Sequence, residues 1–243
     1  MSKRNRPVVA EATEQESELH EVYAAWLQSV VPDFDGAMRA VANARVRDAM
    51  RLTLERAGPQ PGVAACRKHG AAGRAVWVWS DLHLGHEAIL RHARRPFGNA
   101  QHMAAELQAR ALAAGMAPDD WLICLGDLAF IGDAEVRAWL RGIPGRKVLI
   151  LGNHDVDGRH HKNPLRWGLE GVTDSLELTL GSTRLWLTHY PIDAALLPAG
   201  VVNVHGHIHQ HLVEGQKHLN VCVEHTGYRP LRLDEVLRQH GLR

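Results

Sequence analysis

Hydrophobic residues recur with a helical period in the first part of the chain. From Glu16 onward one helix face carries Leu19, Val22, Tyr23, Trp26, Leu27 and Val30. A second helix is predicted over about residues 37–57, because apolar residues again fall on one face until a Gly-Pro pair ends the pattern. Residues 58–74 are rich in Gly, Ala and Pro, and we interpret them as a linker.

From residue 75 the hydrophobic residues form short continuous runs instead. Strands are expected at 75–80, 121–125, 147–151, 175–180, 184–188, 201–205 and 219–224, with helices at about 99–114, at 133–141 and from Asp234. Alternating strands and helices followed by a strand-rich half predict an α/β (α+β) fold, a β-sandwich of two sheets flanked by helices. We therefore divide the chain into a disordered N-terminus (1–15), a helical extension with linker (16–74) and a main domain (75–243).

Composition bears on the cellular compartment and the binding partners of the protein, but does not indicate its chemistry. The 243 residues have a formal net charge of +1, which gives no argument for binding nucleic acid or an anionic membrane. The three cysteines lie far apart and form neither a disulfide framework nor a paired zinc motif, so a reducing compartment is expected. With no signal peptide and no run of membrane-spanning length, we expect a cytoplasmic protein without a membrane partner. The 17 histidines are unusual, and their positions matter.

Polar residues of one kind follow the apolar runs. Asp81 and His83 follow the first, and alternation in an extended chain would point both to the same side. The other runs are followed by Asp127, by Asn153, His154 and Asp155, by His189, and by His205, His207 and His209. Taken singly, each of these residues could instead cap a turn or be a buried histidine with a purely structural role. Because ligands gather at the carboxyl ends of strands in open α/β sheets, the whole set predicts a binding site.

The donor types point to metal ions. Carboxylate, amide oxygen and imidazole suit manganese, iron, zinc or nickel, and no thiolate takes part in the pattern. Seven candidate ligands exceed what one ion with an open coordination position needs. Two divalent ions that share a carboxylate would use them all.

At this point the series D-x-H, G-D, G-N-H-D, H and G-H-x-H, in this order over about residues 75–230, resembles the calcineurin-like metallophosphoesterase superfamily. The resemblance implies the same two-sheet sandwich flanked by helices. It implies that Asp81, His83 and His209 hold one ion and Asn153, His189 and His207 the other, with Asp127 bridging them. The expected cofactors are two divalent ions, manganese first, with iron, zinc or nickel as alternatives.

The resemblance also implies an activity, the hydrolysis of phosphomonoesters or phosphodiesters by a hydroxide that bridges the two ions. His154 would stabilise the transition state or protonate the leaving group, and Asp155 would fix the His154 tautomer. His86 either reaches the substrate phosphate or caps the helix that follows it. Arg95 either binds substrate phosphate or belongs to the solvated surface.

The N-terminal extension leaves two further functions open. Residues 36–75 carry eight Lys or Arg against two acids, which suits a nuclease whose extension binds DNA or RNA. The same residues suit a solvated helix face paired with residues 11–21, which contain five glutamates. A non-catalytic interaction scaffold of the same fold is a third possibility, although a scaffold has no need of the ligand set. The sequence leaves open the phosphoester substrate, including a nucleotide or nucleic acid, and the oligomeric state.

Overall fold

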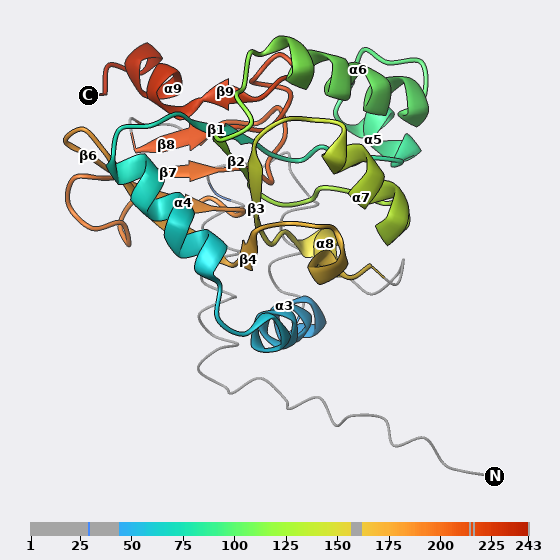
Figure 1. Ribbon diagram of the computed structural model, residues 1–243. Helices are drawn as coiled ribbons and strands as arrows, with labels where there is room; N and C mark the ends of the chain where they lie inside the picture. The colour runs from blue at the N-terminus through green and yellow to red at the C-terminus, as the bar shows by residue number, and fades with distance from the viewer. Residues whose placement is uncertain (1–28, 30–43, 157–161, 214, 216, 243) are drawn as a thin grey trace.

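The computed structural model describes residues 29, 44–156, 162–213, 215 and 217–242 (Figure 1). The disordered N-terminus and the helix predicted from Glu16 fall outside these residues, apart from residue 29. The helix predicted over 37–57 is described as α3, Ala44–Ala57.

Two β-sheets form the centre of the molecule. The first has the strand order β4-β3-β2-β1-β9, and the second has the order β5-β6-β7-β8. Neighbours β1 to β4 are parallel, whereas β9 runs antiparallel to β1. In the second sheet only the β5–β6 pair is antiparallel. The strands are β1 (Val76–Trp79), β2 (Trp121–Cys124), β3 (Arg146–Ile150), β4 (Gly171–Thr173), β5 (Ser175–Leu180), β6 (Thr183–Thr188), β7 (Val201–His205), β8 (His218–Asn220) and β9 (Leu231–Arg232).

The central strands β1 and β2 of the first sheet are apolar throughout, because both faces of the sheet are buried there. In β1, Trp77 and Trp79 face one hydrophobic cluster, which also contains helix residues such as Met103 and Leu107. The alternate residues Val76 and Val78 face the other cluster, between the two sheets. Because successive residues of a central strand face two different apolar clusters, these strands have continuous rather than alternating apolar residues.

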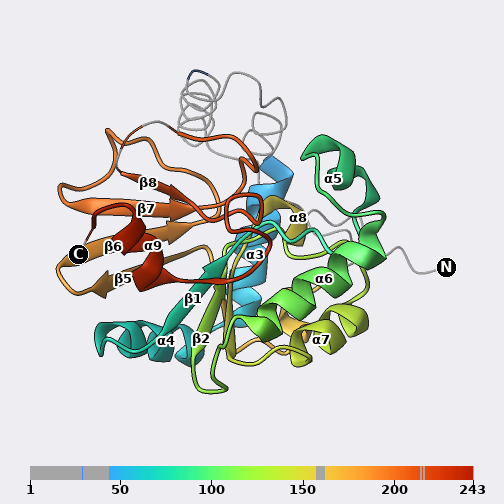
Figure 2. The same cartoon turned by 90° about the horizontal axis from the view of Figure 1, so that it is seen from above.

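Helices cover the side of the first sheet that faces away from the second sheet (Figure 2). They are α5 (Glu87–His92), α6 (Ala100–Ala113) and α7 (Asp133–Arg141). Helix α3 lies beside the short helix α8 (Asn153–Val156), and a 3-10 turn spans Pro164–Arg166. The last helix, α9 (Leu233–Gln239), contributes to the cluster between the sheets. The predicted two-sheet fold with flanking helices is confirmed.

The linker predicted over 58–74 is wrong for most of its length, because Pro61–Ala71 form helix α4. Val63 and Cys66 of α4 are buried in the cluster between the sheets, and the helix packs against β5. Pro61 begins the helix at a position where its missing N–H costs nothing. No helix within the described ranges combines the length and hydropathy that crossing a membrane requires.

Candidate metal centre

The seven predicted metal ligands meet at the carboxyl ends of the strands. Asp81 and His83 follow β1, Asp127 follows β2, Asn153 begins α8 after β3, His189 follows β6, and His207 and His209 follow β7. All seven side chains belong to buried residues. Among the described residues, three groups have candidate ligand atoms within 4.8 Å of one another: Asp81, His83 and Asp127; Asp127, His189 and His207; Asp81, His209 and Cys222.

Asp127 lies between the two predicted ligand sets, which form two halves of this cluster. Its Oδ1 accepts a hydrogen bond of 2.8 Å from the backbone N–H of His154. Its Oδ2 lies 3.7 Å from His83 Nε2 and 3.5 Å from His189 Nε2. One carboxylate oxygen therefore faces an imidazole of each predicted ligand set.

One half of the cluster is formed by His189, His207 and Asn153. His189 Nε2 lies 3.2 Å from both Asn153 Oδ1 and His207 Nδ1. His189 Nδ1 lies 2.7 Å from the Leu125 carbonyl oxygen, which accepts its proton when Nδ1 is protonated. That contact fixes the ring and, in the neutral tautomer, leaves Nε2 as the nitrogen available to a metal.

In the other half, only one oxygen of Asp81 is engaged. Asp81 Oδ2 accepts hydrogen bonds from Ser80 Oγ at 2.6 Å, the His207 backbone N–H at 2.8 Å and Cys222 Sγ at 3.2 Å. Asp81 Oδ1 and His83 Nε2 lie 3.7 Å apart, and both are buried without a hydrogen-bond partner in the described part of the chain. Buried polar atoms are normally paired, so this pair fits a cation that they would share.

The electrostatics of the cluster favour positive charge. Burial raises the pKa values of Asp81 and Asp127, but the surrounding histidines more than offset it, so both pKa values lie well below their usual range. Burial alone would lower the pKa of His189, whereas the charge of Asp127 and its contact with the ring raise it to about 9. Burial lowers the pKa values of His83 and His207, which keeps both rings neutral as metal ligands must be.

The backbone at the predicted ligands is unusual. Seven non-glycine residues in the described ranges have a positive φ, and five of them are predicted ligands: Asp81, His83, Asp127, His207 and His209. Such conformations persist where the surrounding structure enforces them, and they cluster at functional sites. Asp81 and His83 have φ values of 59° and 52°, so the turn after β1 brings them together rather than the extended chain that the sequence suggested.

Residues 75–239 match the calcineurin-like phosphoesterase family, which is more than half of the chain. The chain belongs to this family. An uncharacterized protein of Methanocaldococcus jannaschii is 27% identical over 174 residues, which cover 68% of this chain and 90% of that protein. The gene 66 protein of Mycobacterium phage L5 is 27% identical over 181 residues, covering 63% and 85%. A solved structure from Aquifex aeolicus, of a protein of unknown function, shares the fold with a TM-score of 0.54 at 23% identity, over 68% of this chain and 98% of that one.

The two residues predicted to act in catalysis have different surroundings in the structure. His154 is half-buried beside the ligands, with its ring centroid 5.5 Å from that of His83. Asp155 is fully buried and accepts backbone hydrogen bonds from Gly152 at 2.8 Å, Asp127 at 2.9 Å and Leu128 at 2.9 Å. The predicted contact with the His154 imidazole is not among the hydrogen bonds of Asp155 in the described residues. Asp155 instead fixes the loop that carries Asp127, while burial and the nearby Asp127 raise its pKa to about 6.

For His86 and Arg95 the structure excludes the alternative to substrate binding. His86 occupies the position before α5, but its side chain does not cap the helix. Its Nδ1 lies 3.1 Å from His83 Nδ1, and its ring stacks on Phe130 at 4.1 Å between centroids. Arg95 does not belong to the solvated surface, because its side chain is buried and bound to Glu224 and to the backbone carbonyls of Asp81 and Leu82. Its binding of substrate stays a prediction.

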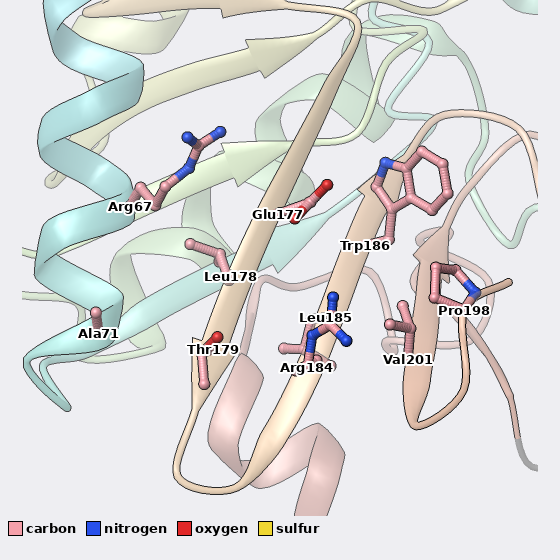
Figure 3. Close-up of a pocket in the computed structure, with 10 residues that line it drawn as sticks. All are labelled: Arg67, Ala71, Glu177, Leu178, Thr179, Arg184, Leu185, Trp186, Pro198 and Val201. Carbon is pink, nitrogen blue, oxygen red and sulfur yellow. The ribbon is translucent and has the colours of Figure 1, made fainter.

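Sequence reasoning missed Glu224 and Cys222, which touch the cluster. Glu224 contacts His209, and Cys222 contacts Asp81. Both come after β8 and carry no local motif, so only the position of the segment Val221–Glu224 beside β1 would have found them. A groove elsewhere is lined by α4, β5, β6 and β7, including Arg67, Arg184 and Trp186 (Figure 3), and contains none of the predicted ligands.

Proposed function

We propose that the protein is a hydrolase that cleaves phosphate esters with two divalent metal ions. The position of Asp127 Oδ2 between His83 Nε2 and His189 Nε2, at 3.7 and 3.5 Å, carries the proposal. A carboxylate oxygen placed in this way suits a ligand shared by two ions. Manganese is our first choice of metal, since oxygen and imidazole donors without a required thiolate suit it.

Some residues of the chain would bind the metal ions, and His154 would transfer a proton. Asp81, His83 and His209 would hold one ion, and Asn153, His189 and His207 the other. When bound, the ions would activate water and offset the negative charge of the phosphate. His154, which is half-buried at the edge of the cluster, would donate a proton to the leaving oxygen. Asp155 would keep Asp127 in place through its three backbone hydrogen bonds.

The proposal is tested by metal content and turnover of Asp127→Asn. Asn has nearly the shape of Asp and tolerates the positive φ of this position, so the fold is expected to survive. We expect the variant to lose tight binding of both ions and to lose on the order of 10³-fold in turnover of bis-p-nitrophenyl and p-nitrophenyl phosphate. Metal content is measured by mass spectrometry after loading with manganese, iron, nickel or zinc.

The matched control is Asp174→Asn, which makes the same change at an exposed carboxylate outside the cluster. This control should keep both ions and full turnover. Wild-type turnover by Asp127→Asn with added manganese would refute the two-metal mechanism. A wild-type protein that binds both ions and hydrolyses no ester in a panel including nucleotides and oligonucleotides would support the scaffold instead.

A further inference from the structure

Glu224 links His209 to a buried arginine. Its Oε1 lies 3.4 Å from His209 Nδ1 and accepts hydrogen bonds from Arg95, at 2.9 Å from Nε and 2.7 Å from Nη2. The side chains of Arg95 and Glu224 are 0% and 6% exposed, so both charges are withdrawn from water. A buried ion pair is costly unless its geometry and hydrogen bonds are good, which this pair satisfies on the arginine side.

Arg95 reaches beyond Glu224 to the turn after β1. Its Nη2 donates to the carbonyl oxygen of Asp81 at 2.6 Å, and its Nη1 donates to that of Leu82 at 3.0 Å. The backbone of Asp81 and of Leu82, which precedes His83, is thus held by the same guanidinium that holds Glu224. The planar fork of arginine can make these contacts together, which a lysine ammonium cannot.

In the part of the chain that the structure describes, the predicted ligand that Glu224 contacts is His209, which belongs to the same predicted set as Asp81 and His83. Arg95 binds the backbone carbonyls of Asp81 and Leu82, next to His83, and Glu224 contacts His209. In the other half, the Leu125 carbonyl contacts His189. A carboxylate on one nitrogen of a metal-binding histidine fixes the ring and the tautomer, and raises its basicity as a ligand. The 3.4 Å approach of Glu224 Oε1 to Nδ1 would leave His209 Nε2 as the nitrogen available to a metal.

We propose that Glu224 and Arg95 are positioning residues that set the affinity of one metal site, the site of Asp81, His83 and His209, and leave the other unchanged. This inference rests on the proposed function. The Arg95 guanidinium fixes both the turn that carries Asp81 and His83 and the carboxylate that orients His209. The two ions would therefore bind with affinities that can be altered separately.

The experiment is a calorimetric titration of metal-free protein with Mn²⁺, comparing wild type with Glu224→Gln and Arg95→Lys. We expect one of the two binding steps to weaken about 10- to 100-fold and the other to stay within error. The matched control is Glu170→Gln, which removes the same charge from the exposed Arg146–Glu170 pair and should leave both steps unchanged. Thermal unfolding without metal measures any loss of fold, and Glu224→Asp replaces a variant that does not fold.

Each result decides the matter. Weakening of one step in Glu224→Gln or Arg95→Lys, with the control unchanged, supports the proposal, because a general loss of packing would affect both steps. Unchanged affinities at both steps, or equal weakening of both, would overturn it. A wild-type protein that binds no Mn²⁺ would instead overturn the two-metal function on which the inference rests.

Discussion

Gly126, which precedes Asp127, is expected to tolerate no side chain. Its φ is +92°, a conformation that residues with a Cβ rarely adopt. A Cβ built on Gly126 would overlap His189 Nδ1 and would lie 2.7 Å from the Gly152 backbone nitrogen. In Gly126→Ala the methyl group must therefore displace the imidazole of a predicted ligand and break its contact with the Leu125 carbonyl.

The expected loss of stability in Gly126→Ala has two sources, the positive φ and the clash of the added methyl group. The positive φ costs about 1–2 kcal/mol for an alanine. Forcing a methyl group into a packed site adds about 1–3 kcal/mol. Gly115 separates the two effects, because its φ is +81° and a Cβ there would meet nothing within 4 Å. Gly115→Ala should thus lose about 1–2 kcal/mol, and Gly126→Ala about 2–5 kcal/mol.

Thermal unfolding of the two variants, in chelator and in excess Mn²⁺, measures the difference. For a chain of this length each kcal/mol corresponds to about 2–4 °C in Tm. We also expect added Mn²⁺ to stabilise Gly115→Ala as it does wild type, and to stabilise Gly126→Ala less because His189 is displaced. Equal losses in the two variants, with equal stabilisation by Mn²⁺, would refute the close approach of Gly126 to His189.

Two further predictions test catalysis and the core. His154→Ala should keep both metals while turnover falls about 10²–10⁴-fold, more for esters with a poor leaving group than for nitrophenyl esters; loss of a metal would instead make His154 a ligand. Cys66→Ser places a hydroxyl in the apolar cluster between the sheets, and should lower the free energy of unfolding by about 1–3 kcal/mol without changing metal content. Unchanged stability in denaturant titration would contradict the packing of α4 against the sheets.

The central strands could be predicted because burial on both faces leaves a signal in a few adjacent residues. Val76–Trp79 and Trp121–Cys124 are wholly buried, and the predicted runs contain them. Helix α4 gives no such signal, since Gly62 and Gly70 lower its helix propensity. A Cβ on Gly62 would overlap the Glu170 carbonyl, so this glycine serves close packing against a distant segment. Tertiary contacts override local preference there, and a single sequence does not reveal them.

In the candidate site, too, some residues could be predicted from local sequence and others could not. That the predicted ligands lie together could be predicted because each follows a strand, and strand ends converge in this fold. Arg95 and Glu224 are 129 residues apart in the chain, and nothing near either residue indicates the other. Arg95 follows another arginine before a proline, a pattern as typical of a surface loop as of a buried ion pair. Its role depends on the path of the chain after β8, which local patterns do not determine.

The turns that carry the predicted ligands Asp81 and Asp127 are held by backbone hydrogen bonds to each other. The backbone N–H of Asp81 donates to Gly126 at 3.1 Å, and that of His83 donates to Asp127 at 3.0 Å, so the turns after β1 and β2 fix each other. These contacts sustain strained conformations that cost about 1–3 kcal/mol each. They also hold candidate ligand oxygens of Asp81 and Asp127 within 4.8 Å, where two negative charges repel. Without metal, a protonated His189 offsets part of this charge. The two turns therefore bring two carboxylates together in a way that would favour a bound cation.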